Sequence, residues 1–336
     1  MALTERYLNT ELTSGANDGT SEADAWQSWS DAIAGISPGD RLNVKRTSST
    51  DVLGDITFDV DATSTKPIHI RAYKDSIGDG GLYEFTHNSN LEYLKFTGSA
   101  LIVEGLKDKN GDEDYRGLRS EADYSLFYRC WFSAGDSISR GRARYVACVI
   151  TGGAYNGNRN IHFDRCFFKA LRNRDEILKI DQYFGSVCMT NSIIKSNNTT
   201  PAIRSYRANE NPDSLYIVGN TFYDCSSAIY FQDLPDFGDS PFLIQGNVFH
   251  SMENYAIERD PSGNNGDSIN HLKLANNFYG NCTPHNFGDL PEPGMQTISD
   301  TAADIFVDPA NDDFSPAKGS PIVNAIDSAQ DKELPQ

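Results

Sequence analysis

Long apolar stretches are missing from this sequence of 336 residues. No apolar run approaches the roughly 20 residues that an α-helix needs to cross a bilayer, so we expect no membrane insertion. Residues 1–7 have no cationic segment followed by an apolar one, and we therefore expect no secretory signal. Glycine (27) and proline (14) occur in ordinary numbers, which excludes collagen-like and low-complexity chains.

Basic side chains are also scarce. The chain has 29 lysines and arginines against 47 acidic residues, which gives a formal net charge of −18. This charge repels phosphate backbones and anionic membrane surfaces, so the sequence predicts no nucleic-acid partner. Any basic patch is expected to be a local exception.

Cysteines are too few for a disulfide scaffold in a chain of this length. The six are Cys130, Cys148, Cys166, Cys188, Cys225 and Cys282. No Cys-x-x-Cys pair occurs and no histidine has zinc-like spacing from two of them, which argues against a zinc cluster. We expect free, buried thiols.

An eight-residue pattern recurs seven times along the central part of the chain. The copies begin at Ser125, Ala143, Ile161, Val187, Leu215, Phe242 and Leu272, separated by 18, 18, 26, 28, 27 and 30 residues. Position three is always apolar, and position eight is apolar or aromatic. Because side chains alternate with a period of two, the pattern predicts strands.

Position six of the repeat holds a small or amide residue every time. Its occupants are Cys130, Cys148, Cys166, Ser192, Asn220, Asn247 and Asn277. The alternation breaks here, which indicates a bend that recurs in every copy. Asparagines stacked in register can hydrogen-bond along the stack, so we expect an internal column at this bend.

A second apolar column follows the later copies. Ile177, Ile203, Ile229 and Ile257 each lie in a short segment after a copy of the pattern. Each turn therefore has at least two inward-facing strands joined by polar segments of varying length. This organisation is typical of a parallel β-solenoid.

The repeat resembles that of right-handed parallel β-helix proteins, the pectin-lyase-like superfamily. Residues 17–45 resemble the usual opening of such domains, with a short amphipathic helix over residues 29–36, and residues 304–325 resemble their closing segment. The resemblance implies an all-β, single-stranded right-handed β-helix. We expect an N-terminal segment with a capping helix (1–41), the β-helix (42–305), and a closing segment with a polar tail (306–336).

Polar side chains beside the second column are expected to point outward and to form a basic, aromatic strip. The strip would contain Arg172, Lys179, Arg204, Tyr206, Arg207, Tyr230 and Arg259. Aromatic faces stack on pyranose rings and cations meet acidic groups, so we expect glycan contacts from Tyr206, Tyr230 and Arg259. The alternative is a solvated sheet face with ordinary charge pairs.

Two chemistries are compatible with this superfamily. The resemblance implies lyases that remove the proton beside a uronate carboxyl with a Lys or Arg base, often with Ca²⁺, and Lys179, Arg204 or Arg207 could serve. Hydrolases need paired carboxylates, for which the candidates are Asp175, Glu176, Asp181, Asp233 and Glu258. No catalytic motif matches residue by residue, so whether the chain is an enzyme stays open, with a lyase favoured over a hydrolase.

One acidic run has oxygen ligands at alternate positions, as a calcium loop requires. It contains Asp108, Asn110, Asp112 and Asp114. It departs from the EF-hand pattern, because Gly111 stands fourth and Arg119 stands twelfth. A solvated acidic loop is the alternative to a Ca²⁺ site.

The expected lack of a signal peptide and the free thiols both suit a protein made in a host cytoplasm and released by lysis. The N-terminal segment also resembles phage β-helix proteins. Our leading hypothesis is a virion-associated protein, such as a capsid decoration, tail fibre or tailspike component, which binds other virion proteins or a host glycan. The alternative is a secreted lyase or hydrolase acting on an acidic polysaccharide, and a third hypothesis is a surface adhesin. A tailspike would favour a trimer, although no sustained heptad is present.

Overall fold

The computed structural model forms two compact units, Met1–Ile161 and His162–Gln336, which are described separately. The structure describes residues 3–87, 93–109, 117–132, 142–151, 154–156, 160–170, 176–180, 185–196, 200–205, 214–232, 241–260, 272–286, 290–299 and 301–322. Within this part of the chain, neither helix has the length and apolar character needed to cross a membrane.

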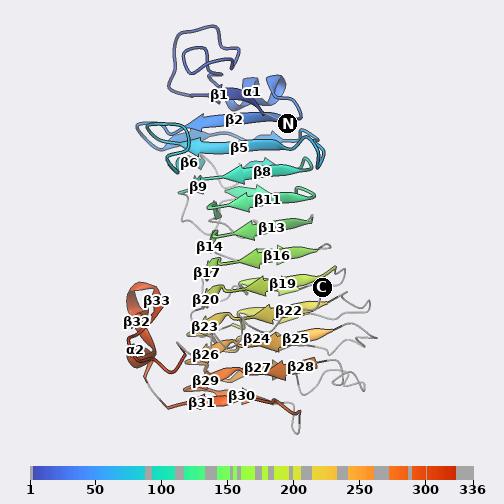
Figure 1. Ribbon diagram of the computed structural model, residues 1–336, viewed down its shortest axis with the longest axis vertical. Coiled ribbons are helices and arrows are strands. Elements are labelled where there is room, and N and C mark those ends of the chain that lie inside the picture. The colour runs from blue at the N-terminus through green and yellow to red at the C-terminus, as the bar shows by residue number, and fades with distance from the viewer. Residues whose placement is uncertain are drawn as a thin grey trace. The chain divides into compact units, whose positions relative to one another are not determined.

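Unit 1 begins with β1 (Thr4–Leu8) and helix α1 (Trp29–Gly35), followed by strands of three parallel sheets (Figure 1). Sheet I has the order β1, β2 (Asp40–Lys45), β5 (Ile68–Tyr73), β8 (Leu101–Glu104), β11 (Ser125–Tyr128) and β13 (Ala143–Val146). Sheet II has β3 (Asp51–Leu53), β6 (Tyr83–His87), β9 (Leu106–Asp108), β12 (Trp131–Phe132) and β14 (Val149–Thr151). Sheet III has β4 (Ile56–Phe58), β7 (Leu94–Phe96) and β10 (Leu118–Ser120), and β15 (Ala154–Asn156) follows β14 in the chain.

Unit 2 repeats the three parallel sheets. Its sheet I contains β16 (Ile161–Asp164, of which only the first residue belongs to unit 1), β19 (Val187–Thr190), β22 (Leu215–Val218), β25 (Phe242–Gln245) and β28 (Leu272–Ala275). Its sheet II contains β17 (Phe167–Lys169), β20 (Ile193–Lys195), β23 (Thr221–Tyr223), β26 (Val248–His250), β29 (Phe278–Gly280) and β31 (Gln296–Ile298). Its sheet III contains β18 (Leu178–Ile180), β21 (Ile203–Ser205), β24 (Ile229–Phe231), β27 (Tyr255–Arg259) and β30 (Thr283–His285).

Consecutive copies of the repeat lie on neighbouring parallel strands in register. In unit 2, Leu215 pairs with Phe242, and Phe242 pairs with Leu272. The second column is in register as well, with Ile203 beside Ile229 and Ile229 beside Ile257. The predicted all-β, right-handed parallel β-helix with a short N-terminal helix is thus confirmed.

The predicted bend lies between sheets I and II in every copy. Position five has a left-handed backbone each time, at Arg129, Ala147, Arg165, Asn191, Gly219, Gly246 and Asn276, with φ between 50° and 67°. This conformation turns the chain and leaves position six pointing inward. Only glycine adopts it without steric cost, so the five other occupants are held there by the surrounding coils.

The asparagine column at position six is a continuous hydrogen-bonded ladder. Asn220 and Asn247 each donate their backbone N–H to the next asparagine's Oδ1 over 2.9 Å. Asn277, at the end of the column, donates its Nδ2 to Glu292 over 2.8 Å. All three asparagines are completely buried, so the ladder satisfies amide groups that would otherwise be unpaired.

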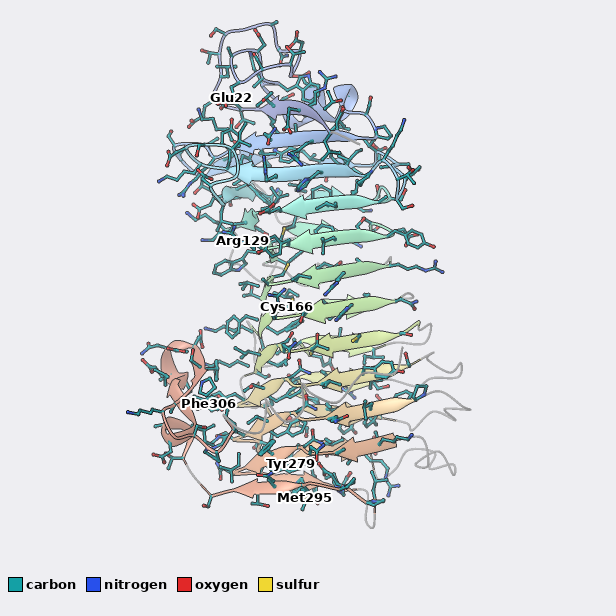
Figure 2. All side chains as sticks on the ribbon, viewed as in Figure 1. Glu22, Arg129, Cys166, Tyr279, Met295 and Phe306 are labelled. Atoms are coloured by element: carbon teal, nitrogen blue, oxygen red, sulfur yellow. The ribbon has the colours of Figure 1, made fainter. Side chains whose placement is uncertain are left out.

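Two cysteines of the column, Cys130 and Cys148, use an acceptor equivalent to that of the asparagines. Asn247 donates Nδ2 to the position-three carbonyl of the preceding coil, that of Ile217, over 2.8 Å. Cys148 points its thiol at the equivalent carbonyl of Phe127, with Sγ 3.4 Å from the oxygen. At position six, Cys130, Cys148 and Cys166 are buried thiols outside any disulfide, as predicted, and a weak S–H donor takes the place of an amide there. Cys225 is buried as well, but Cys188 and Cys282 are partly exposed, so the expectation of burial is wrong for these two. Figure 2 labels Cys166, which occupies this position in unit 2.

Helix α1 begins at a capped N-terminus. The Ser28 hydroxyl accepts a hydrogen bond from the backbone N–H of Asp31 over 3.1 Å. Trp29 is buried, and its indole N–H donates to the hydroxyl of Tyr83 over 3.1 Å. The helix thereby joins the sheet II core of unit 1.

Residues 301–322 form a strap on the outward face of sheet II in unit 2 (Figure 1). It comprises α2 (Ala302–Ile305), β32 (Phe306–Asp308), the 3-10 turn Pro309–Asn311 and β33 (Asp313–Pro316). Phe306 and Phe314 pack against Tyr223, which points outward from β23, and Figure 2 labels Phe306 on the strap. The strap therefore covers an apolar sheet face.

Two lysines of sheet II fasten the strap. Lys169 and Lys195 place their Nζ atoms 2.8 and 2.5 Å from the Asp312 carboxylate. Burial pushes the pKa of Asp312 upward, but the hydrogen bonds from the two lysines outweigh it, and the pKa is lowered from its usual value. The contact is therefore strongest when Asp312 is ionised.

We predict that Asn247→Ala destabilises unit 2 by about 2–4 kcal/mol. The substitution leaves the buried amide of Asn220 and the carbonyl of Ile217 without their partners. Urea unfolding followed by circular dichroism measures the change. Asn276→Gly is the matched control, because it removes an asparagine one position before the ladder at a bend that glycine adopts freely, and it should stay within about 1 kcal/mol of the parent.

We also predict that the strap loosens in acid. A lowered carboxyl pKa stabilises the folded state above the unfolded value of about 4, and this contribution disappears as the pH falls through the folded value. At neutral pH, Asp312→Asn should mimic the protonated state and speed amide hydrogen exchange in β33. Asp313→Asn is the control, because it makes the same charge change on a side chain whose hydrogen bond is to Ser315 in its own turn. Equal acceleration of hydrogen exchange in both variants would refute the role of the lysine contact.

Candidate functional site

Sheet III of unit 2 carries three members of the strip expected from the sequence, Lys179, Arg204 and Tyr230. Lys179, Arg204, Tyr230 and Glu258 are register partners on β18, β21, β24 and β27. All four side chains are partly exposed; Lys179, Arg204 and Tyr230 each lie between two buried residues, whereas Glu258 follows the buried Ile257 and precedes the partly exposed Arg259. Since adjacent strands are about 4.8 Å apart, the four side chains form one file, which we call the strip.

Arg204 is the most tightly held member of the strip. Its Nη1 is 3.0 Å from Oε1 of Glu176, and its Nη2 donates to Oε1 of Gln232 over 3.2 Å. The guanidinium also lies over the ring of Tyr230, 5.3 Å from the centroid. These contacts fix the orientation of a permanent positive charge beside Lys179.

Tyr230 supports the guanidinium and remains a neutral phenol. Its hydroxyl donates to Oδ2 of Asp260 over 2.9 Å. Burial, together with the hydrogen bond to this carboxylate, raises the pKa of Tyr230 to about 12. The ring is thus a fixed platform for Arg204, which differs from the open sugar-stacking surface expected from the sequence.

The remaining end of the strip is anchored through polar side chains. The hydroxyl of Ser227 donates to the carboxylate of Glu258. Arg259 lies one position further along β27, beside Phe231 of β24, and therefore outside the file. Asn286 accepts from the backbone N–H of Arg259 over 2.7 Å and donates to its carbonyl over 2.8 Å.

The other predicted members of the site fall outside the described residues. They are Arg172, Asp175, Asp181, Tyr206, Arg207 and Asp233.

The expected calcium run is described only at its first member, because Asn110, Asp112 and Asp114 also lie outside the described residues. Asp108 is 1% exposed, and its Oδ2 accepts the backbone N–H of Leu118 over 3.1 Å. A Cβ on Gly117 would collide with this carboxylate at 1.4 Å, so the two groups are closely fitted. Asp108 therefore accepts a hydrogen bond from the backbone beside it. Among the described residues, no group of histidine, cysteine, aspartate and glutamate side chains is arranged to hold a metal ion.

Sequence reasoning missed a cluster of cations on sheet II of unit 1. Glu84 points outward from β6 and meets Arg46 at 3.3 Å, Lys107 at 3.2 Å and Lys109 at 3.3 Å. Lys107 also lies 4.7 Å from the ring centroid of Trp131. We call these five residues the Glu84 cluster. Aligning the alternating strands of residues 83–87 and 106–108 would have revealed the pairing of Glu84 with Lys107.

A second polar network missed from the sequence lies on sheet I of unit 1. Arg41 donates to Glu5 over 3.0 Å and to Nδ1 of His69 over 3.2 Å. The pKa of Glu104 is lowered chiefly by its interaction with His69, with further help from Arg129, labelled in Figure 2. This network pairs its charges internally, so it is an ordinary ladder of side chains along the sheet.

Several solved structures are similar to this chain. A PL6 family polysaccharide lyase from Pseudopedobacter saltans matches at 17% identity and a TM-score of 0.47, over 75% of this chain and 62% of its own length. An alginate lyase from a Paenibacillus species matches at 14% identity and a TM-score of 0.47, over 80% of this chain and 94% of its own. A pectate lyase matches at 13% identity and a TM-score of 0.44, over 91% of this chain and 84% of its own.

No protein-family model matches the chain, and no curated protein matches it either. The solved structures named above are polysaccharide lyases, but identities this low say nothing about the activity of this chain.

Proposed function

We propose that this chain cleaves an acidic polysaccharide by β-elimination, with Lys179 as the general base and Arg204 as the charge that meets the uronate carboxylate. One observation carries the proposal: Lys179 and Arg204 are direct register partners on adjacent strands. Because adjacent strands are about 4.8 Å apart, the two side chains start close enough for one to approach the acidic C–H of a uronate while the other approaches its carboxylate.

The two residues are assigned from their chemistry. A guanidinium stays protonated and binds carboxylates in a planar, two-point geometry, so Arg204 suits substrate binding and stabilisation of charge. A neutral lysine amine can accept a proton from carbon as a general base. Lys179 is partly exposed and is the register partner of Arg204, so its amine lies beside the fixed cation.

The reaction follows from these positions. Lys179 removes the proton on the carbon next to the carboxyl, and the electron pair moves toward a carboxylate stabilised by Arg204. A carbon–carbon double bond then forms as the adjacent glycosidic C–O bond breaks, and the departing oxygen takes up a proton. The products are an unsaturated uronate end and a new reducing end, with no water consumed.

The described carboxylates of the strip favour a lyase over a hydrolase. Hydrolysis needs one carboxylic acid and one carboxylate directed at the substrate. Glu176 is paired with Arg204, and Glu258 accepts from Ser227, so both are engaged with the protein. None of the three solved structures named above is a virion protein, and the proposal takes up the acidic-polysaccharide alternative of the sequence analysis.

We predict that the chain releases unsaturated uronate products from at least one member of a panel containing alginate, polygalacturonate and hyaluronan. Ultraviolet absorbance of the new double bond measures the reaction. Lys179→Ala should lower turnover by about 10²–10⁴-fold, the usual contribution of a general base.

Two further variants control this test. Lys273→Ala removes an exposed lysine from β28 of sheet I and should leave turnover unchanged. Arg204→Lys keeps the charge but loses the two-point geometry and the stacking on Tyr230, so kcat should fall while circular dichroism stays the same. Absence of turnover on every member of the panel, or full activity of Lys179→Ala, would rule out the proposed reaction.

A further inference from the structure

The Glu84 cluster of unit 1 contains more positive charge than its carboxylate neutralises. Arg46, Lys107 and Lys109 all approach Glu84 within 3.3 Å, so three cations share one anion. The local charge is therefore +2 on a chain whose net charge is −18. One cation would be enough to neutralise Glu84, so the other two leave positive charge that has no described anionic partner in this cluster.

The cations also keep hydrogen-bonding capacity. Arg46 has five guanidinium donors, and its side chain donates one hydrogen bond among the described residues, to Glu84. The side chains of Arg46 and Lys109 are 38% and 42% exposed, whereas Glu84 is 15% exposed. The carboxylate therefore lies beneath a layer of donors that faces solvent.

Trp131 adds an aromatic surface to the same line of residues. Glu84 pairs with Lys107, and Lys107 pairs with Trp131, on the successive strands β6, β9 and β12. Neighbouring members are thus about 4.8 Å apart, close to the width of one pyranose ring. Trp26 and Trp29 are 5% and 2% exposed, whereas Trp131 is partly exposed beside the lysine.

We propose that the Glu84 cluster is a binding site for an anionic glycan, separate from the strip. The guanidinium and the two ammonium groups bind carboxylate or sulfate groups of the glycan, and the indole of Trp131 packs against an adjacent sugar ring. A nucleic acid is disfavoured, because a long polyphosphate would meet the repulsion of the remaining acidic surface. The site requires no catalysis and goes beyond the proposed lyase activity.

The intrinsic fluorescence of Trp131 can report ligand binding at this cluster. The chain has three tryptophans, and two are buried, so ligand-induced changes in intrinsic fluorescence report mainly on Trp131. Titrations use the Lys179→Ala chain, in which the expected loss of turnover spares the ligand during the measurement. The ligands are an oligogalacturonate, a sulfated oligosaccharide and a neutral glucan oligosaccharide of matched length.

We expect a saturable fluorescence change with at least one anionic ligand and none with the neutral one. Comparing the carboxylated ligand with the sulfated one identifies the group recognised. The double variant Lys107→Ala/Lys109→Ala should weaken binding at least tenfold and reduce its dependence on salt. Lys95→Ala is the matched control: it removes a lysine of β7 in sheet III that is paired with Glu121, and it should bind as the parent does.

Glu84→Gln separates ligand binding from a merely structural role. Removing the competing carboxylate frees the three cations, so the anionic ligand should bind more tightly, whereas a structural ion-pair cluster would only lose stability. Calorimetry with Trp131→Phe checks that binding persists when the fluorescent signal is gone. Equal affinity in the double lysine variant, equal binding of the neutral glycan, or weaker binding by Glu84→Gln would overturn the proposal.

These outcomes are independent of the lyase proposal. Binding by the Lys179→Ala chain without turnover by the parent would support this site and refute the reaction. Turnover by the parent without a fluorescence response at Trp131 would support the reaction and refute this site.

Discussion

The recurring bend between sheets I and II is the constraint on which the rest of the structure depends. A left-handed residue turns the backbone there. The inward residue after it donates to the position-three carbonyl of the preceding coil at Cys148, Asn220, Asn247 and Asn277, whereas Ser192 donates to Thr190 of its own coil. Asn247 makes this bond with an amide and Cys148 with a thiol, so two different side chains meet one geometric requirement. Because the buried acceptor would otherwise lack a partner, the bond fixes where each coil lies on the one before it.

Fixed register is what turns a repeating fold into a surface with defined chemistry. When the strands of successive coils pair in the same register, residues at one outward position form a file with neighbours about 4.8 Å apart. Lys179 and Arg204 are separated by 25 positions in the chain but lie side by side on sheet III. The length of the intervening segment has no effect on that contact, so the connecting segments can vary while the file is kept.

The strip and the Glu84 cluster hold their cations on this acidic protein in different ways. In the strip, Arg204 has its own carboxylate in Glu176 and its own aromatic support in Tyr230, which makes it a rigid group. In the Glu84 cluster, one carboxylate is shared among three cations, which leaves positive charge facing outward. A cation paired with its own carboxylate has a fixed orientation, whereas cations that share one carboxylate keep excess positive charge that attracts an anion.

The sequence alone determined the coil, because side-chain alternation and the amide at position six are local properties that each copy repeats. It predicted the inward residues and the column that includes Asn220, Asn247 and Asn277. Only the tertiary structure decided which outward side chains meet. The contact of Glu84 with Arg46 joins residues 38 positions apart, and no local pattern encodes the register between them. The same holds for the strap, since the apolar residues Phe306 and Phe314 predict burial without specifying which face of the β-helix they cover.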